Sequence, residues 1–192
     1  MSLTAPVGKT QSLAAMLLLF GALFISACSL GFQYIGGYQP CQLCYIQRHV
    51  HYGMIPASLV VLALIWKKAP AWLIRITFLA LFALLGYGWV TGIYQAGAEW
   101  QFWLGPNDCA NTVAISNNAA DMFANLGQTK LIRCDVAQLR ILGLSFGGWN
   151  VVLSTGLMLI ALAGAFLSKD AIAPLARRLP IVDRLASSLI KD

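Results

Sequence analysis

Four long apolar tracts constrain this chain more than any other feature of its sequence. They cover residues 12–30, 48–66, 72–94 and 147–167, and a helix needs about 20 mainly apolar residues to cross the hydrocarbon of a bilayer. The chain is 59% hydrophobic and 10% charged, with a mean hydropathy of +0.72, which excludes an ordinary soluble domain. Since backbone amides in lipid must be satisfied within their own segment, we expect an all-α membrane protein. The predicted fold is a single domain over residues 1–192, a four-transmembrane-helix antiparallel bundle with a long loop between helices 3 and 4.

The basic residues predict the topology of this bundle. They gather at the N-terminus, in the turn between the second and third tracts, and in the tail: Lys9, Lys67, Lys68, Arg75, Lys169, Arg177, Arg178, Arg184 and Lys191. Under the positive-inside rule these segments are cytoplasmic. Both termini and the tail, residues 168–192, are then inside, and the loops at 31–47 and 95–146 face outward. The net charge of +6 is therefore a topology signal, and no nucleic-acid partner is expected.

Cysteine positions indicate an oxidising compartment. Cys41, Cys44, Cys109 and Cys134 lie in or beside the two outward loops. Disulfides persist outside the cytosol, so these four residues are interpreted as two pairs. Cys28 lies inside the first tract and is expected to be a small apolar filler. A lysine, an apolar run and small residues up to Cys28 also fit a cleaved leader, but its removal would leave three spans.

The stretch around the first two cysteines is the most informative. Proline favours the first helical position, so Pro40 predicts that Cys41 and Cys44 lie in the opening turn of the second helix. Unpaired amides and the positive end of the helix dipole stabilise a thiolate there. A thiolate is the species that attacks and leaves in disulfide exchange.

Helical spacing places Cys41, Cys44, Arg48 and His51 on one face, whereas His49 points elsewhere. Arg48 could support the thiolate and donate to a carbonyl oxygen, or it could be an anchor at the headgroups. His51 could be a satisfied polar residue of the bundle or a proton relay.

A C-x-x-C motif by itself also fits a metal site or a structural disulfide. Zinc would need four ligands, and Cys41, Cys44, His49 and His51 offer that count. However, His49 points away from the cysteine face, and a metal would leave the loop cysteines without a role. We therefore expect no metal.

These residues together form a recognisable pattern. The motif is Pro40-Cys41-x-Leu43-Cys44-x-x-Gln47-Arg48, a cysteine pair follows in the long loop, and Gly143-Leu144-Ser145 and Trp149-Asn150 lead into the last span. Over about residues 12–167, the chain resembles the disulfide bond formation protein B (DsbB) family.

The resemblance implies a quinone-dependent thiol oxidase of the bacterial inner membrane that serves periplasmic protein folding. Cys41 and Cys44 would form a disulfide that ubiquinone or menaquinone regenerates, with Cys44 contacting the quinone and Arg48 assisting its binding. Cys109 and Cys134 would form the second disulfide and accept electrons from a thioredoxin-fold partner such as DsbA. Cys109 would form the mixed disulfide with that partner, and Cys134 would then react with Cys41.

Two departures and two alternatives accompany the resemblance. Gln42 stands where many members have a small or apolar residue. No histidine follows Tyr94, where some members place one near the quinone, so the polar contribution of the third span is in doubt. The alternatives are a non-catalytic scaffold held by two disulfides, and an enzyme of the vitamin K epoxide reductase type. That second family places its C-x-x-C after the loop cysteines, the reverse of the order here.

Overall fold

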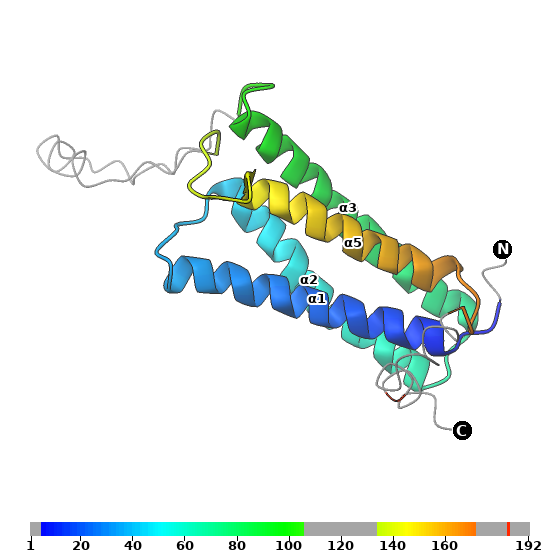
Figure 1. Ribbon diagram of the computed structural model, residues 1–192. Helices are drawn as coiled ribbons and strands as arrows, with labels where there is room; N and C mark the ends of the chain where they lie inside the picture. The colour runs from blue at the N-terminus through cyan, green and yellow to red at the C-terminus, as the bar shows by residue number, and fades with distance from the viewer. Residues whose placement is uncertain (1–4, 106–133, 172–183, 185–192) are drawn as a thin grey trace, which may run out of the picture.

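The computed structural model describes residues 5–105, 134–171 and 184 and contains four long helices within them. These are α1 (Lys9–Tyr34), α2 (Gln42–Trp66), α3 (Ala71–Glu99) and α5 (Phe146–Phe166). Each is long and apolar enough to cross a membrane. Figure 1 shows an elongated bundle whose neighbouring helices run in opposite directions along its length. The prediction of a four-span helical membrane protein is confirmed.

The helix ends differ from the predicted spans. α2 begins at Gln42, and α3 continues to Glu99, because polar end turns that hydropathy does not detect are also helical. A hairpin of two short antiparallel strands precedes α5: β1 (Arg140–Ile141) and β2 (Leu144–Ser145). Its turn contains Gly143 at a φ of +85°, a conformation that glycine adopts without steric cost. Residues 106–133 of the long loop and most of the tail lie outside the described residues.

Small residues let the helices approach closely, as is common in membrane bundles. The core joins Leu18 of α1, Met54 of α2, Phe78 of α3 and Ala161 of α5, each with no exposed surface. Gly164 of α5 faces the Phe78 ring, and a Cβ added to Gly164 would lie 2.5 Å from a ring carbon. The contact between α3 and α5 therefore depends on this glycine.

Arg75 closes the end of the bundle that is opposite to the cysteines. Its side chain is 1% exposed and donates to the backbone oxygens of Ala5, Ala165 and Leu167. The last carbonyls of a helix have no partner within the helix, so Arg75 satisfies the end of α5. This arrangement joins the starts of α1 and α3 to the end of α5.

We expect Gly164→Ala to lower the unfolding temperature in detergent, because the new methyl group would overlap the buried Phe78 ring. Overpacking of this kind costs about 1–3 kcal/mol. Gly156→Ala is the matched control in the same helix, since a Cβ there meets nothing within 4 Å. Equal unfolding temperatures for the two variants would contradict the close contact.

Candidate active site

The C-x-x-C motif forms the start of α2. Cys41 is the N-cap residue, and its sulfur accepts a hydrogen bond of 3.3 Å from the backbone N–H of Cys44. Pro40 therefore precedes the cap, and the prediction that it takes the first helical position is wrong. The helix starts later because the Cys41 sulfur caps one of its unpaired amides. Cys44 remains in the first turn, where we expected it.

The two sulfurs of the motif are neighbours. Cys41 Sγ and Cys44 Sγ lie 2.6 Å apart, so the two residues could form a disulfide with little movement. The disulfide between them stays a prediction.

Cys134 lies against this pair. Its side chain is 1% exposed, and it forms a buried cluster with Cys41 and Leu43. Cys134 is disulfide-bonded, whereas its predicted partner Cys109 lies outside the described residues. The structure thus brings a loop cysteine from far along the chain to the mouth of α2.

A cavity of about 290 Å³ opens beside the pair, between α1, α2, α3 and α5. Its lining includes Cys41, Cys44, Arg48 and His51, the face predicted from helical spacing. His49 is exposed, and its ring Nδ1 lies 2.6 Å from the Tyr45 carbonyl oxygen. The predicted face is therefore the face that borders the cavity.

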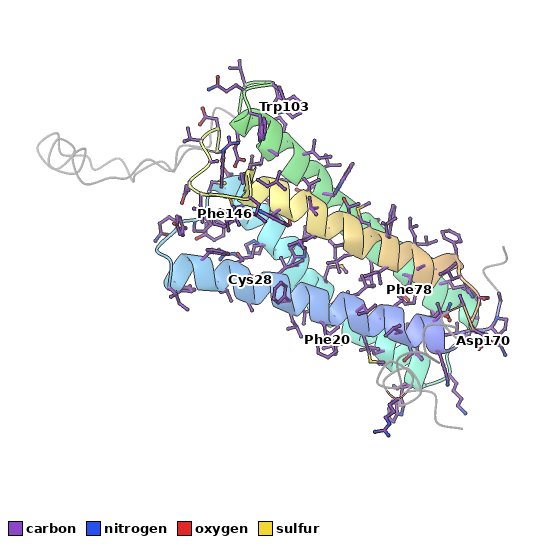
Figure 2. The ribbon with its side chains drawn as sticks, viewed as in Figure 1. Phe20, Cys28, Phe78, Trp103, Phe146 and Asp170 are labelled. Carbon is purple, nitrogen blue, oxygen red and sulfur yellow. The ribbon has the colours of Figure 1, made fainter. Side chains whose placement is uncertain are left out.

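Aromatic rings form the apolar wall of the cavity. The Phe146 ring, labelled at the start of α5 in Figure 2, lies 5.0 Å from the Phe32 ring and 5.9 Å from the Tyr38 ring. Edge-to-face contacts of this kind stabilise ring clusters. An apolar wall with a few polar groups is typical of sites for small organic ligands.

Arg48 is held inside the bundle. Its side chain is 7% exposed, donates to Gln33 Oε1 of α1, and places its guanidinium carbon 4.6 Å from the centre of the Tyr45 ring. Of the two interpretations of Arg48, the structure thus favours a residue of the site over a headgroup anchor. Its planar fork of five donors suits a carbonyl oxygen in the cavity.

One of the two ring nitrogens of His51 has a hydrogen-bond partner among the described residues. Its Nε2 lies 2.9 Å from Asn150 Oδ1, and Asn150 Nδ2 donates to the Gly88 carbonyl at 3.3 Å. The buried Nδ1 makes no hydrogen bond among the described residues. One ring nitrogen is therefore structural, and the other remains available at the cavity.

Two site residues were missed by the sequence analysis. Gln95 and Glu99, near the end of α3, are 3% and 8% exposed and line the cavity. Polar residues four apart at the end of an apolar span are a usable signal, because such residues are costly near lipid unless they have partners. The third span thus makes a polar contribution, although no histidine follows Tyr94.

The electrostatics of the pair are asymmetric. The hydrogen bond with the Cys44 side chain, followed by burial, raises the pKa of the Cys41 thiol. Both sulfurs lie at the positive end of the helix dipole, which favours negative charge, and Cys44 Sγ also lies 3.4 Å from the Gln95 Nε2 donor. We infer that Cys41 keeps its proton while Cys44 is the nucleophile.

Comparison with known families decides the identity. The family model for disulfide bond formation protein DsbB matches residues 11–164, which is most of the chain. The chain belongs to the DsbB family. No curated protein and no solved structure gives a significant match. Membership of the DsbB family supports disulfide bond formation as the general role, with thiol oxidoreductase chemistry in a multi-pass membrane protein.

For this DsbB-family site we expect iodoacetamide to alkylate Cys44 before Cys41 in the reduced protein. Since the raised pKa of Cys41 keeps it protonated, its alkylation should start only at more alkaline pH. Peptide mass spectrometry after timed alkylation would measure both rates. Faster modification of Cys41 at neutral pH would contradict the assignment of Cys44 as the nucleophile.

Proposed function

We propose that this protein is an inner-membrane thiol oxidase that passes electrons from a periplasmic dithiol protein to a membrane quinone. Its donor would be a DsbA-like protein of the thioredoxin fold, and its acceptor ubiquinone or menaquinone. The observation that carries the proposal is the position of the Cys41/Cys44 pair. The pair packs against Cys134 of the loop, and both of its cysteines also line the cavity.

The topology fits this direction of transfer. Lys9, Lys67, Lys68 and Lys169 lie at the end of the bundle opposite to the cysteines, where Thr10 N–H donates to the Lys169 carbonyl at 3.1 Å. Under the positive-inside rule that end is cytoplasmic. The cysteines would then face the periplasm, and both termini would lie inside.

Exchange would begin at the loop disulfide. A partner thiolate attacks Cys109, and Cys134 leaves as a thiolate. Cys134 then attacks Cys41 in the oxidised pair, and Cys44 leaves as a thiolate. The second partner thiol releases the oxidised partner from Cys109, which then attacks Cys134 and frees Cys41. The net result is one oxidised partner and one reduced Cys41/Cys44 pair.

The position of Cys134, which is disulfide-bonded, supports this order. Because Cys134 and Cys41 already belong to one buried cluster, the exchange between them needs little movement of Cys41. Positioning of reacting groups is a large part of catalysis in such systems.

The cavity residues fit a quinone. Phe32, Tyr38 and Phe146 offer an apolar wall for a planar ring, and Arg48 offers donors for a ring oxygen. His51 contributes Nδ1, a buried polar atom without a hydrogen-bond partner among the described residues. Bound quinone would supply the two-electron acceptor that the side chains lack. Cys44 would direct its sulfur into the cavity, and Cys41 would close the disulfide behind it.

The decisive test is anaerobic mixing of purified protein with a reduced DsbA-like partner and a soluble quinone, followed by quinol absorbance. We expect turnover in the wild type and none in Cys44→Ser, since the nucleophile is lost. Ser58→Ala, at a buried position of the same helix that does not line the cavity, is the control and should turn over normally. Equal rates for wild type and Cys44→Ser would remove Cys44 from the mechanism.

Arg48 should act mainly on quinone binding. We expect Arg48→Met to raise KM for quinone by about 10- to 100-fold, because a hydrogen bond to a charged group contributes about 1.5–3 kcal/mol. Arg48→Lys keeps the charge but not the planar arrangement of donors, so its KM should lie between those of the wild type and Arg48→Met. Steady-state kinetics at saturating partner would measure this effect. An unchanged KM in Arg48→Met would place the quinone away from Arg48.

A further inference from the structure

The end of α3 contributes an amide to the redox pair. Gln95 Nε2 lies 3.4 Å from Cys44 Sγ, and the Cys44 thiol can also donate to Gln95 Oε1 at 3.6 Å. The same amide can thus accept from the sulfur when it is a thiol and donate to it when it is a thiolate. Gln95 is 3% exposed, so little water competes for these contacts.

Two neighbours determine which way the amide faces. Gln95 Nε2 donates to Glu99 Oε1 at 2.8 Å, and Gln47 Nε2 donates to Gln95 Oε1 at 2.7 Å. A carboxylate only accepts hydrogen bonds, so it requires the N–H side of the amide. With one N–H used by Glu99, the second is the one available to Cys44.

Glu99 is separately fixed in place. Its backbone oxygen accepts from Arg140 Nη2 at 3.3 Å, and the Arg140 guanidinium carbon lies 5.1 Å from the centre of the Trp100 ring. Its Oε2 is buried and makes no hydrogen bond among the described residues. In the described part of the chain, the bond to Gln95 is the contact through which the carboxylate acts on the site.

We propose that Gln95 is a catalytic residue that stabilises the Cys44 thiolate by donating to its sulfur, and that Glu99 is the positioning residue that holds the Gln95 amide in the donating orientation. The inference rests on the proposed redox role of the Cys41/Cys44 pair. Stabilising the thiolate stabilises the reduced pair, which makes the disulfide a stronger oxidant of its thiol partner. α3 would thereby tune the redox equilibrium of the pair.

The carboxylate has a second effect of opposite sign. A negative charge near the sulfurs disfavours a thiolate, whereas the positioned amide favours it. Loss of the charge should therefore favour the Cys44 thiolate, and loss of the hydrogen bond should disfavour it. Two substitutions of Glu99 can separate these effects.

The first measurement is the equilibrium of the Cys41/Cys44 pair with glutathione, in full-length protein carrying Cys109→Ser and Cys134→Ser. The protein disulfide and two glutathione thiols give the dithiol and one glutathione disulfide, so neither quinone nor partner is needed. Gln95→Met should shift this equilibrium about tenfold toward the protein disulfide, given the usual strength of a hydrogen bond to a charged group. The alkylation rate of Cys44 should fall as well.

Gln11→Met is the matched control for this substitution. Gln11 is a fully buried glutamine at the other end of the bundle, and it bonds the Gly164 and Leu167 carbonyls. It should lower stability and leave the glutathione equilibrium unchanged. An equal shift in Gln11→Met and Gln95→Met would make the effect one of general stability and would overturn the proposal.

The second measurement compares Glu99→Gln with Glu99→Met in the same background. Glutamine lacks the charge but can still accept from Gln95 Nε2, whereas methionine can do neither. We expect several-fold slower alkylation of Cys44 in Glu99→Met than in Glu99→Gln. Equal rates in the two variants, both above the wild-type rate, would show that Glu99 acts by charge alone and would overturn its positioning role.

The two variants of Glu99 also carry the test if Gln95→Met does not fold. Failure of the wild type to reduce quinone would refute the proposed acceptor, and it would be seen in a separate assay from these quinone-free measurements. An unchanged glutathione equilibrium in folded Gln95→Met would refute the role of Gln95 even if quinol forms normally.

Discussion

A polar side chain inside a membrane-spanning bundle must find its partner within the protein, because the surrounding lipid offers none. At one end of the bundle, Arg75 and Gln11 use the backbone carbonyls near the end of α5. At the other end, Gln95 and Glu99 bond one another beside Cys44. The same requirement thus closes one end of the fold and organises the chemistry at the other.

The start of α2 brings the cysteine pair into contact with two different features of the structure. Cys41 forms a buried cluster with Cys134, Cys44 packs against that cluster, and both cysteines line the cavity. Because Cys41 is the N-cap residue, its position is tied to the position of the helix itself. The exchange with a loop cysteine and the transfer to an acceptor in the cavity, as proposed above, could therefore both take place at this one pair.

Close packing of α3 against α5 places the third helix within reach of the sulfur. A Cβ added to Gly147 would lie 3.1 Å from the side-chain amide carbon of Gln95, and one added to Gly92 would lie 3.0 Å from Asn150 Nδ2. Larger residues at these two positions would separate the helices and move Gln95 and Asn150. The glycines of the bundle are thus part of the support for the site as well as of its packing.

The sequence by itself determined the four spans, the placing of Cys41, Cys44 and Cys134 at one end of the bundle, and the face shared by Cys41, Cys44 and Arg48. Each depends on hydropathy, charge or helical period, which are local properties of the chain. Only the tertiary structure decided that Cys134 lies on Cys41, that Arg48 bonds Gln33, and that Gln95 reaches Cys44 from α3. These contacts join residues far apart in the chain, and they follow from how closely the helices pack, which no local pattern encodes. The N-cap role of Cys41 was also left to the structure, because a sulfur caps the helix where proline was expected to begin it.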